Sequence, residues 1–351
     1  MRILLVKTSS LGDVIHNLPV VRDLLAQRPD CVIDWVVERA LAEIPRLHPG
    51  VRRVIPVGLR AWRQRLLEGS TWREIAEFGQ ELRAESYDLV IDTQGLLKSA
   101  LVARRARGPR CGYDAGSARE PAASRFYDRR YPVPRALHAV ERNRRLVAAA
   151  AGYAPEGAPD YGLGAVPPGP TFGPSGGTEM EPPGLTFSPS GGTGTLPSSV
   201  AFGRPHAVLL TATSRDDKLW PEADWIALGT ALCARGLHCL LPAGTATERE
   251  RAARIAAALP AATALPAQTL TELATTLAAT RLAVGVDTGL VHLAAALGRP
   301  TLALFRASDP GLTGVMAGKG GAPAENLGAR GAPPAVGTVI ARALELSACR
   351  A

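Results

Sequence analysis

Residues 284–296 read VGVDTGLVHLAAA, a short apolar run that passes through a polar turn into an apolar helical pattern. The run predicts a buried strand, and Asp287, Thr288 and Gly289 mark the start of the helix. Backbone N–H groups at such a helix start can bind phosphate oxygens, and a glycine lets a ligand approach closely. The stretch therefore predicts one strand–turn–helix unit of an α/β sheet with a phosphate-binding turn.

His292 lies four residues after Thr288, so both side chains share one helix face. A single histidine in a helix is often structural. Because His292 is in register with a helix start that can bind phosphate, a binding role is about as well supported as a structural one. The sequence leaves both interpretations open.

The same unit recurs along both halves of the chain. We expect two α/β domains, each a doubly wound parallel sheet, over residues 1–154 and 206–351. The last helix could pack back on the first domain. Buried strands are predicted at 3–6, 32–37, 88–91, 206–210, 237–241, 282–286 and 301–305, and helices near 222–235, 247–258, 269–279 and 289–297.

Residues 155–205 separate the two domains. They contain 11 Pro and 12 Gly and a 15-residue repeat, in which PPGPTFGPSGGTEME at 167–181 is followed by PPGLTFSPSGGTGTL. So few apolar side chains cannot offset the entropy lost on ordering. We predict a linker of low order here.

The charge is concentrated in the first domain. The chain has a net charge of +8, and residues 1–165 carry +7 of it because they hold 26 of the 40 basic and 19 of the 32 acidic residues. This asymmetry favours a surface that faces an anionic partner. Only four of the basic residues are lysines: Lys7, Lys98, Lys218 and Lys319.

Several classes of protein are excluded by what is missing. The six histidines lack the spacing of metal ligands, so we expect no tightly bound metal. No nucleic-acid-binding motif is present, and we expect no nucleic-acid partner. No stretch approaches the roughly 20 apolar residues of a membrane span, and the apolar run before Lys7 is too short for a signal-peptide core. These features predict a soluble or peripheral protein.

Two loops of the first domain carry candidate functional groups. KTSSLGD at 7–13 follows the first strand, and its Asp13 is either a helix N-cap or a general base at the ligand edge of the sheet. DTQGLLKSA at 92–100 follows another strand and places Gln94 and Lys98 at the same edge. Lys98 is by itself more typical of a solvated helix residue.

In the second domain, TATSRDDKLWP at 211–221 follows a strand. The hydroxyl groups and the ammonium of Thr213, Ser214 and Lys218 suit a diphosphate. Asp216 and Asp217 are candidate caps for the helix that starts near Pro221.

Arginine clusters are frequent in the first domain. Arg60 and Arg63 flank Trp62, and a later segment adds four more: Arg119, Arg125, Arg129 and Arg130. Such runs are usually solvated helix faces, but guanidinium groups also form bidentate contacts with carboxylates and phosphates. The clusters therefore fit a polyanionic ligand.

Taken in order, KTSSLGD, DTQGLLKSA, AREP at 118–121, HAVER at 138–142, RDDKLWP at 215–221 and VDTGLVHL at 286–293 resemble glycosyltransferase family 9. The resemblance covers nearly the whole chain outside the linker. It implies a GT-B fold, with two Rossmann-like domains, the acceptor on the first and the nucleotide-sugar on the second. It also implies inverting transfer of L-glycero-D-manno-heptose from ADP-heptose to the first Kdo of Kdo2-lipid A at the cytoplasmic face of the inner membrane, without a tightly bound cofactor.

The resemblance also assigns roles to residues. Asp13 becomes the general base. The residues that would bind the anionic groups of the acceptor are Arg60, Arg63, Gln94, Lys98 and Arg119. Those that would bind the donor are Thr213, Ser214, Lys218, Glu248, Asp287, Thr288, Gly289 and His292.

The chain departs from the family pattern at Arg306, where relatives usually have glycine, in the long linker, and in the Gly/Ala/Pro-rich segment 314–334. Two alternatives remain open at this point. One is a family member with a different donor or acceptor, and the other is an inactive relative that binds a nucleotide or a polyanion.

Overall fold

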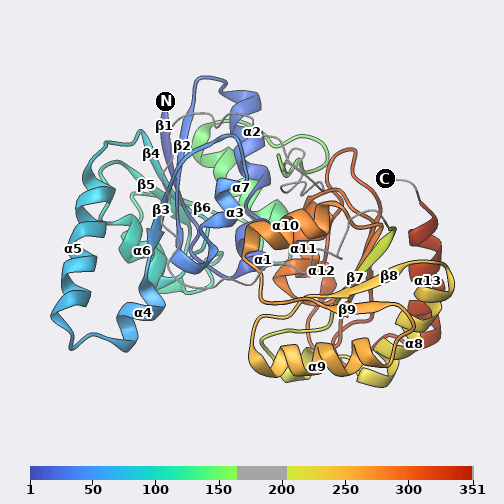
Figure 1. The fold of residues 1–351 in the computed structure, drawn as a ribbon. Coiled ribbons are helices and arrows are strands. Elements are labelled where there is room, and N and C mark those ends of the chain that lie inside the picture. The colour runs from blue at the N-terminus through green and yellow to red at the C-terminus, as the bar shows by residue number, and fades with distance from the viewer. Residues whose placement is uncertain (164–203, 350–351) are drawn as a thin grey trace, which may run out of the picture.

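The computed structural model describes residues 1–163 and 204–349 and contains two parallel sheets (Figure 1). In the described residues each sheet has six strands, in the orders β3-β2-β1-β4-β5-β6 and β12-β11-β10-β7-β8-β9. The predicted pair of doubly wound α/β domains is confirmed. Residues 164–203 of the predicted linker, including the repeat, lie outside the described residues.

The first sheet and its helices occupy residues 2–151. The strands are β1 (Arg2–Val6), β2 (Val32–Glu38), β3 (Val51–Val57), β4 (Leu89–Asp92), β5 (Arg110–Tyr113) and β6 (Arg129–Tyr131). The helices are α1 (Leu11–Ile15), α2 (Pro19–Gln27), η1 (Arg39–Leu41), α3 (Glu43–Arg46), α4 (Leu59–Gln64), α5 (Gly69–Arg83), α6 (Leu97–Ala103), η2 (Pro121–Phe126) and α7 (Ala139–Ala151).

The second sheet repeats this plan over residues 206–348. The strands are β7 (His206–Leu210), β8 (His238–Leu241), β9 (Ala262–Ala264), β10 (Leu282–Val286), β11 (Thr301–Leu304) and β12 (Ala324–Leu327). The helices are η3 (Asp216–Lys218), α8 (Glu222–Ala234), α9 (Ala246–Ala257), α10 (Leu270–Ala278), α11 (Gly289–Ala296), α12 (Pro310–Thr313) and α13 (Val336–Ala348).

Strand order reverses at the same place in both sheets. β1 pairs with β2 on one side and β4 on the other, and β7 pairs with β8 and β10. In such sheets, ligands bind beyond the carboxyl ends of the strands where the order reverses. The loops after β1, β4, β7 and β10 are therefore the loops in which the sequence places its candidate site residues.

One apolar cluster extends across both halves. Alternate residues of β1 point to opposite faces: Ile3 and Leu5 pack with α2 and α7, and Leu4 and Val6 pack under α5 and α6. The first of these two clusters continues into the second half through α10 and α11. The helices between the sheets in Figure 1 thus belong to a core common to both halves.

Helices α1 and α11 form the most extensive contact between elements of the two halves. Gly289 has no Cβ, and one built there would lie 2.4 Å from Leu11 Cγ. The absence of that side chain lets Leu11 sit directly on the first turn of α11. The sequence predicts that Gly289 makes room for a ligand, but in the structure this space is filled by Leu11 of the other half.

Three sequence-based expectations need correction. Helix α13 packs on α8, β10 and β11 of its own half, and not on the first domain. Residues 155–163 are not of low order, because Tyr161 is buried and Arg144 donates hydrogen bonds to two carbonyls of the segment. Asp216 and Asp217 do not cap α8, since they form η3 and Pro221 stands at the N-cap.

A buried ion pair joins α2 to α7. Arg144 Nε lies 2.7 Å from Asp23 Oδ2, and both side chains are largely buried. Replacing Asp23 by alanine removes the two short carboxylate contacts of the guanidinium and leaves the more distant Glu141, 3.6 Å from Nη1, as its ion-pair partner in the described residues. We expect the free energy of unfolding to fall by about 3 kcal/mol. Urea unfolding followed by circular dichroism measures this loss.

Asp160→Ala is the matched control, because the ion pair between Arg22 and Asp160 is half exposed. It should cost less than about 1 kcal/mol. Equal losses in the two variants would contradict the importance of burial here.

Candidate active site

Asp287, directly after β10, is the centre of a polar cluster in the second half. Its Oδ2 accepts a hydrogen bond from Lys218 Nζ at 2.6 Å and another from Ser308 Oγ, and Thr213 Oγ1 donates to its backbone carbonyl at 3.4 Å. The structure thus brings together three residues that the sequence predicts separately, Thr213, Lys218 and Asp287. Ser308 was missed, since its segment FRASDP contains no recognisable site motif.

The charges in this cluster balance each other. Burial disfavours ionisation of Asp287, but the nearby His292 ring and the hydrogen bonds from Lys218 and Ser308 outweigh it and hold the pKa of Asp287 well below its usual value. The carboxylate is therefore ionised at neutral pH and fixes the Lys218 ammonium at the edge of the sheet. An arriving diphosphate would find this ammonium in place.

Helix α11 starts beside the same carboxylate. Thr288 is its N-cap residue, and Gly289 is its first residue. His292 is buried one turn further on, with its Nε2 3.8 Å from Asp287 Oδ1. The ring therefore faces the cluster, as the shared helix face predicts.

Asp13 stands in the first turn of α1, at the third helical position. Ser10 is the N-cap residue, and its N–H and Oγ donate to Asp13 Oδ2 at 3.0 and 3.2 Å. The N-cap interpretation of Asp13 is therefore wrong in detail, because the carboxylate is the return partner of a capping box. Arg119 Nη1 contacts the same oxygen at 3.3 Å. No hydrogen bond from residues 1–163 or 204–349 engages Oδ1.

The surroundings favour the ionised form of Asp13. Burial raises its pKa, but Lys7, Arg119 and the hydrogen bonds from Ser10 more than compensate, so the pKa of Asp13 lies below its ordinary value. A carboxylate with one unused oxygen beside an arginine is suited to accept a proton from a bound hydroxyl.

Lys7, at the carboxyl end of β1, is a functional candidate that sequence reasoning left unexplained. Its ammonium is buried and donates to Thr93 O at 2.9 Å and to Asn143 Oδ1 at 3.3 Å. Burial lowers the pKa of Lys7 to about 8. The side chain is thus still mostly charged at neutral pH and acts on Asp13. The scarcity of lysine in this chain was the signal that could have identified it.

Gln94 and Lys98 have different roles in the loop after β4. Gln94 is buried, and its Oε1 accepts hydrogen bonds from the N–H groups of Thr8 and Ser9. It therefore holds the loop after β1, which makes it a positioning residue rather than an open contact site. Lys98 is exposed, and its Nζ donates to Ser9 Oγ at 3.2 Å.

The remaining predicted site residues are more dispersed. Arg60 and Arg63 are exposed on α4, and nothing in the described residues joins them to Asp13. Ser214 is exposed in the loop before η3. Glu248 is the third residue of α9, and its Oε2 accepts from the N–H groups of Gly244 and Thr245 at 2.9 Å each. Its carboxylate is already used in a capping box.

Arg306 fits into the loop after β11 without disrupting it. Its guanidinium donates to the carbonyl of Leu219, and its own carbonyl accepts from Gly331 N–H. The departure from the family pattern thus ties this loop to the segment that carries Lys218.

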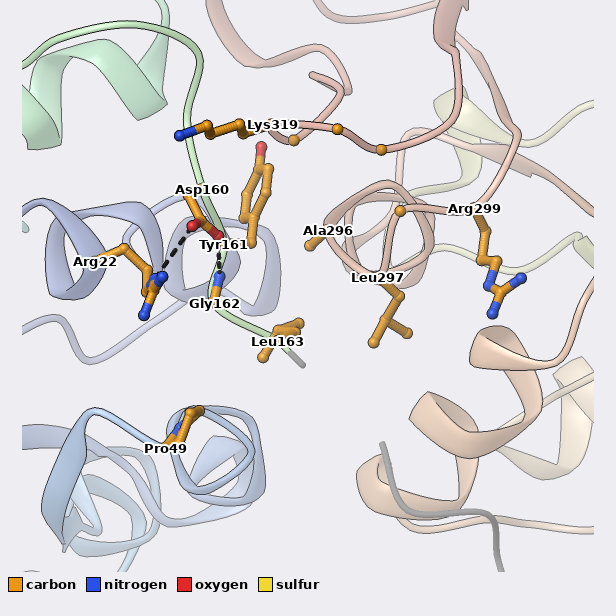
Figure 2. Close-up of a pocket in the computed structure, with 14 residues that line it drawn as sticks. Arg22, Pro49, Asp160, Tyr161, Gly162, Leu163, Ala296, Leu297, Arg299 and Lys319 are labelled. Atoms are coloured by element: carbon orange, nitrogen blue, oxygen red, sulfur yellow. Dashed lines mark hydrogen bonds and ion pairs between the residues drawn. The ribbon is translucent and has the colours of Figure 1, made fainter. Parts of the chain in front are cut away.

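A hollow of about 580 Å³ lies at the other end of α11, between the two halves (Figure 2). Arg22 and Asp160 form an ion pair on one side of it, and Arg299 lies on the other side, apart from Lys319. None of the predicted site residues lines this hollow. The charged groups do not converge on one point, so the loops after β1 and β10 remain the candidate site.

Two kinds of feature are absent from residues 1–163 and 204–349. They contain no group of three or more His, Cys, Asp or Glu side chains arranged to hold a metal ion. None of their helices is both long and apolar enough to cross a bilayer.

Residues 75–327 match glycosyltransferase family 9 (heptosyltransferase), and the chain belongs to this family. Lipopolysaccharide heptosyltransferase 1 of Pseudomonas aeruginosa is 47% identical over 319 residues, which are 90% of this chain and 81% of that protein.

Two solved structures of the heptosyltransferase WaaC of E. coli are also similar to the chain. The one with ADP is 38% identical, covers 99% of this chain and 100% of that chain, and has a TM-score of 0.83. The one with ADP-2-deoxy-2-fluoro heptose is 37% identical, covers 98% of each chain, and has a TM-score of 0.78. The GT-B fold that the sequence resemblance implied is confirmed.

The electrostatic link between Lys7 and Asp13 generates a pH prediction. Lys7→Met removes a cation that lowers the pKa of Asp13, so this pKa should rise. Because a base must be unprotonated to act, the acidic limb of kcat/KM should move to higher pH. The pH dependence of kcat/KM measures the shift.

Lys319→Met is the control, since Lys319 is exposed and is not one of the groups that lower the pKa of Asp13. Its acidic limb should coincide with that of the wild type. An unmoved limb in Lys7→Met would remove Lys7 from the electrostatics of the site.

Proposed function

We propose that this chain transfers L-glycero-D-manno-heptose from ADP-heptose to the first Kdo of Kdo2-lipid A, with inversion at the anomeric carbon. The chain transfers heptose from ADP-heptose in lipopolysaccharide inner-core synthesis, as its close relatives indicate. The observation that carries the finer proposal is the α1–α11 contact. It sets the carboxylate of Asp13 in one half and the Lys218–Asp287 pair of the other at the start of two helices that touch.

Asp13 is the general base in this proposal. Its free Oδ1 takes the proton of the attacking acceptor hydroxyl while Ser10 holds Oδ2. The attack on the anomeric carbon breaks the bond to the diphosphate on the opposite side, which inverts the configuration. Arg119 keeps the carboxylate ionised and faces the acceptor with its exposed guanidinium.

The second half binds the donor. The Lys218 ammonium and the first N–H groups of α11 supply positive charge where negative charge grows on the leaving diphosphate. Thr213, Ser214, Thr288 and His292 are assigned to the same diphosphate site, and Glu248 at the start of α9 is assigned to the nucleoside side. Asp287 holds Lys218 in place for each turnover.

The acceptor is anionic, and the first half is basic. Arg60, Arg63, Lys98 and Arg119 lie on loops and helices of the half that carries +7. A lipid acceptor also brings a membrane surface, whose anionic headgroups attract basic proteins. Peripheral association with the cytoplasmic face of the inner membrane is therefore part of the proposal.

Asp13→Asn tests the base directly. Loss of a general base lowers turnover by about 10²–10⁴-fold, while binding of ADP should persist because the donor half is unchanged. The assay combines ADP-heptose with Kdo2-lipid A and follows the mass of one added heptose. Asp30→Asn, at an exposed aspartate on the α2–β2 loop, is the control and should keep wild-type turnover. Near-normal turnover of Asp13→Asn would end its role as base.

Nucleotide preference tests the donor assignment. ADP should raise the Tm of the protein more than UDP or GDP at equal concentration, because ligands stabilise the state they bind. A preference for UDP would instead support a family member with a different donor. Binding of ADP without any transfer to Kdo2-lipid A would favour the alternative of a different acceptor or of an inactive relative.

A further inference from the structure

His16 and His292 join the two halves of the protein by a buried hydrogen bond. His16 Nε2 lies 3.2 Å from His292 Nδ1, and the two rings meet edge to face with centroids 4.5 Å apart. His16 follows the last turn of α1, the helix that carries Asp13, and His292 stands on α11 beside the donor cluster. The bond therefore connects the two sides of the site.

The helices leave little freedom for this pair. A Cβ on Gly12 would lie 3.3 Å from His292 Cδ2, and Gly289 is covered by Leu11. Both imidazole rings are buried. The orientation of His292 is therefore set by packing, and only the position of its proton remains to be decided.

Hydrogen-bond chemistry decides that position. A neutral imidazole carries one N–H, so one nitrogen of each ring donates and the other accepts. Nε2 of His292 points toward the ionised carboxylate of Asp287, which favours an N–H there. His292 Nδ1 is then the acceptor, and His16 Nε2 must be the donor.

The reverse arrangement is electrostatically worse. A proton on His292 Nδ1 would turn the bare Nε2 lone pair toward the Asp287 carboxylate. It would also require a proton on Nδ1 of His16, and this atom is buried without a hydrogen-bond partner in the described part of the chain. An unsatisfied buried N–H costs free energy, so this proton pattern is disfavoured.

The groups around His16 keep it neutral. The His138 ring is 5.5 Å away, and its state is fixed because Nδ1 accepts from Val140 N–H and Nε2 donates to Gly314 O. Burial first, and then His292, His138 and Lys7, lower the pKa of His16 well below its usual value. On the other side, Asn143 donates to the His16 carbonyl at 3.1 Å.

We propose that His16 is a positioning residue of the transfer reaction: by donating to His292 Nδ1, it holds His292 in the tautomer whose Nε2–H faces Asp287 and the bound diphosphate. The proposal rests on the donor site assigned under the proposed function. His16 does not touch the substrate in this role. In this role His16, at the end of α1, determines which hydrogen bond His292 can donate on the donor side.

His16→Met and His16→Gln test this role. Methionine fills the space but cannot donate, whereas the Gln amide N–H₂ reaches about as far as His16 Nε2. We expect His16→Met to raise the KM for ADP-heptose about tenfold, the effect of one lost buried hydrogen bond. His16→Gln should restore KM to near the wild-type value.

The tautomer itself is read by long-range ¹H–¹⁵N NMR of the histidine rings. We expect His292 to be protonated at Nε2 in the wild type and in His16→Gln, and to lose this preference in His16→Met. Protonation at Nδ1 in the wild type would overturn the proposal, even if His16→Met does not fold. A raised KM with an unchanged tautomer would also overturn it, because packing alone would then explain the effect.

The NMR measurement needs no acceptor. Failure of heptose transfer to Kdo2-lipid A would contradict the proposed function but leave the tautomer result intact. A wild-type enzyme that transfers heptose with His292 protonated at Nδ1 would contradict only the role of His16.

Discussion

The close packing of α1 on α11 is the contact on which the site depends. Two glycines, Gly12 and Gly289, leave space that His292 and Leu11 fill from the opposite helix. Each helix begins at a loop where strand order reverses, so its first turn carries chemistry: Asp13 on one side, and Asp287 just before the other. Because an apolar cluster also runs through this contact, a change of side-chain volume here would alter both the stability of the protein and the distance between Asp13 and Asp287.

Lys7 and Lys218, on the two sides of the site, differ in their counter-charges. In the second half, the charges of Asp287 and Lys218 neutralise each other locally, so the ammonium is held in place without excess charge. In the first half, Lys7 is buried without an ion pair in the described residues and influences Asp13 at longer range, while Arg119 contacts Asp13 directly. This arrangement keeps the carboxylate of Asp13 ionised.

The sequence was most informative where strands are fully buried. β1, β4, β7 and β10 are short apolar runs, and their periodicity identified them and placed the loops that follow them. Strands β3, β5, β6, β9 and β12 were not predicted, since they lie toward the sheet edges and mix polar with apolar residues. Lys218 and Asp287 could be proposed from motifs, but the role of Gln94 could not, because a buried amide and an exposed one look alike in sequence.

The sequence by itself determined the fold class, the loops of the site and the family, because these follow from local periodicity and from short motifs in a set order. Only the tertiary structure decided which residues meet. Ser308 reaches Asp287, Lys7 acts on Asp13, and His16 bonds to His292 across 276 positions of the chain. Such pairs depend on how two helices from different halves pack, and no local pattern encodes that distance.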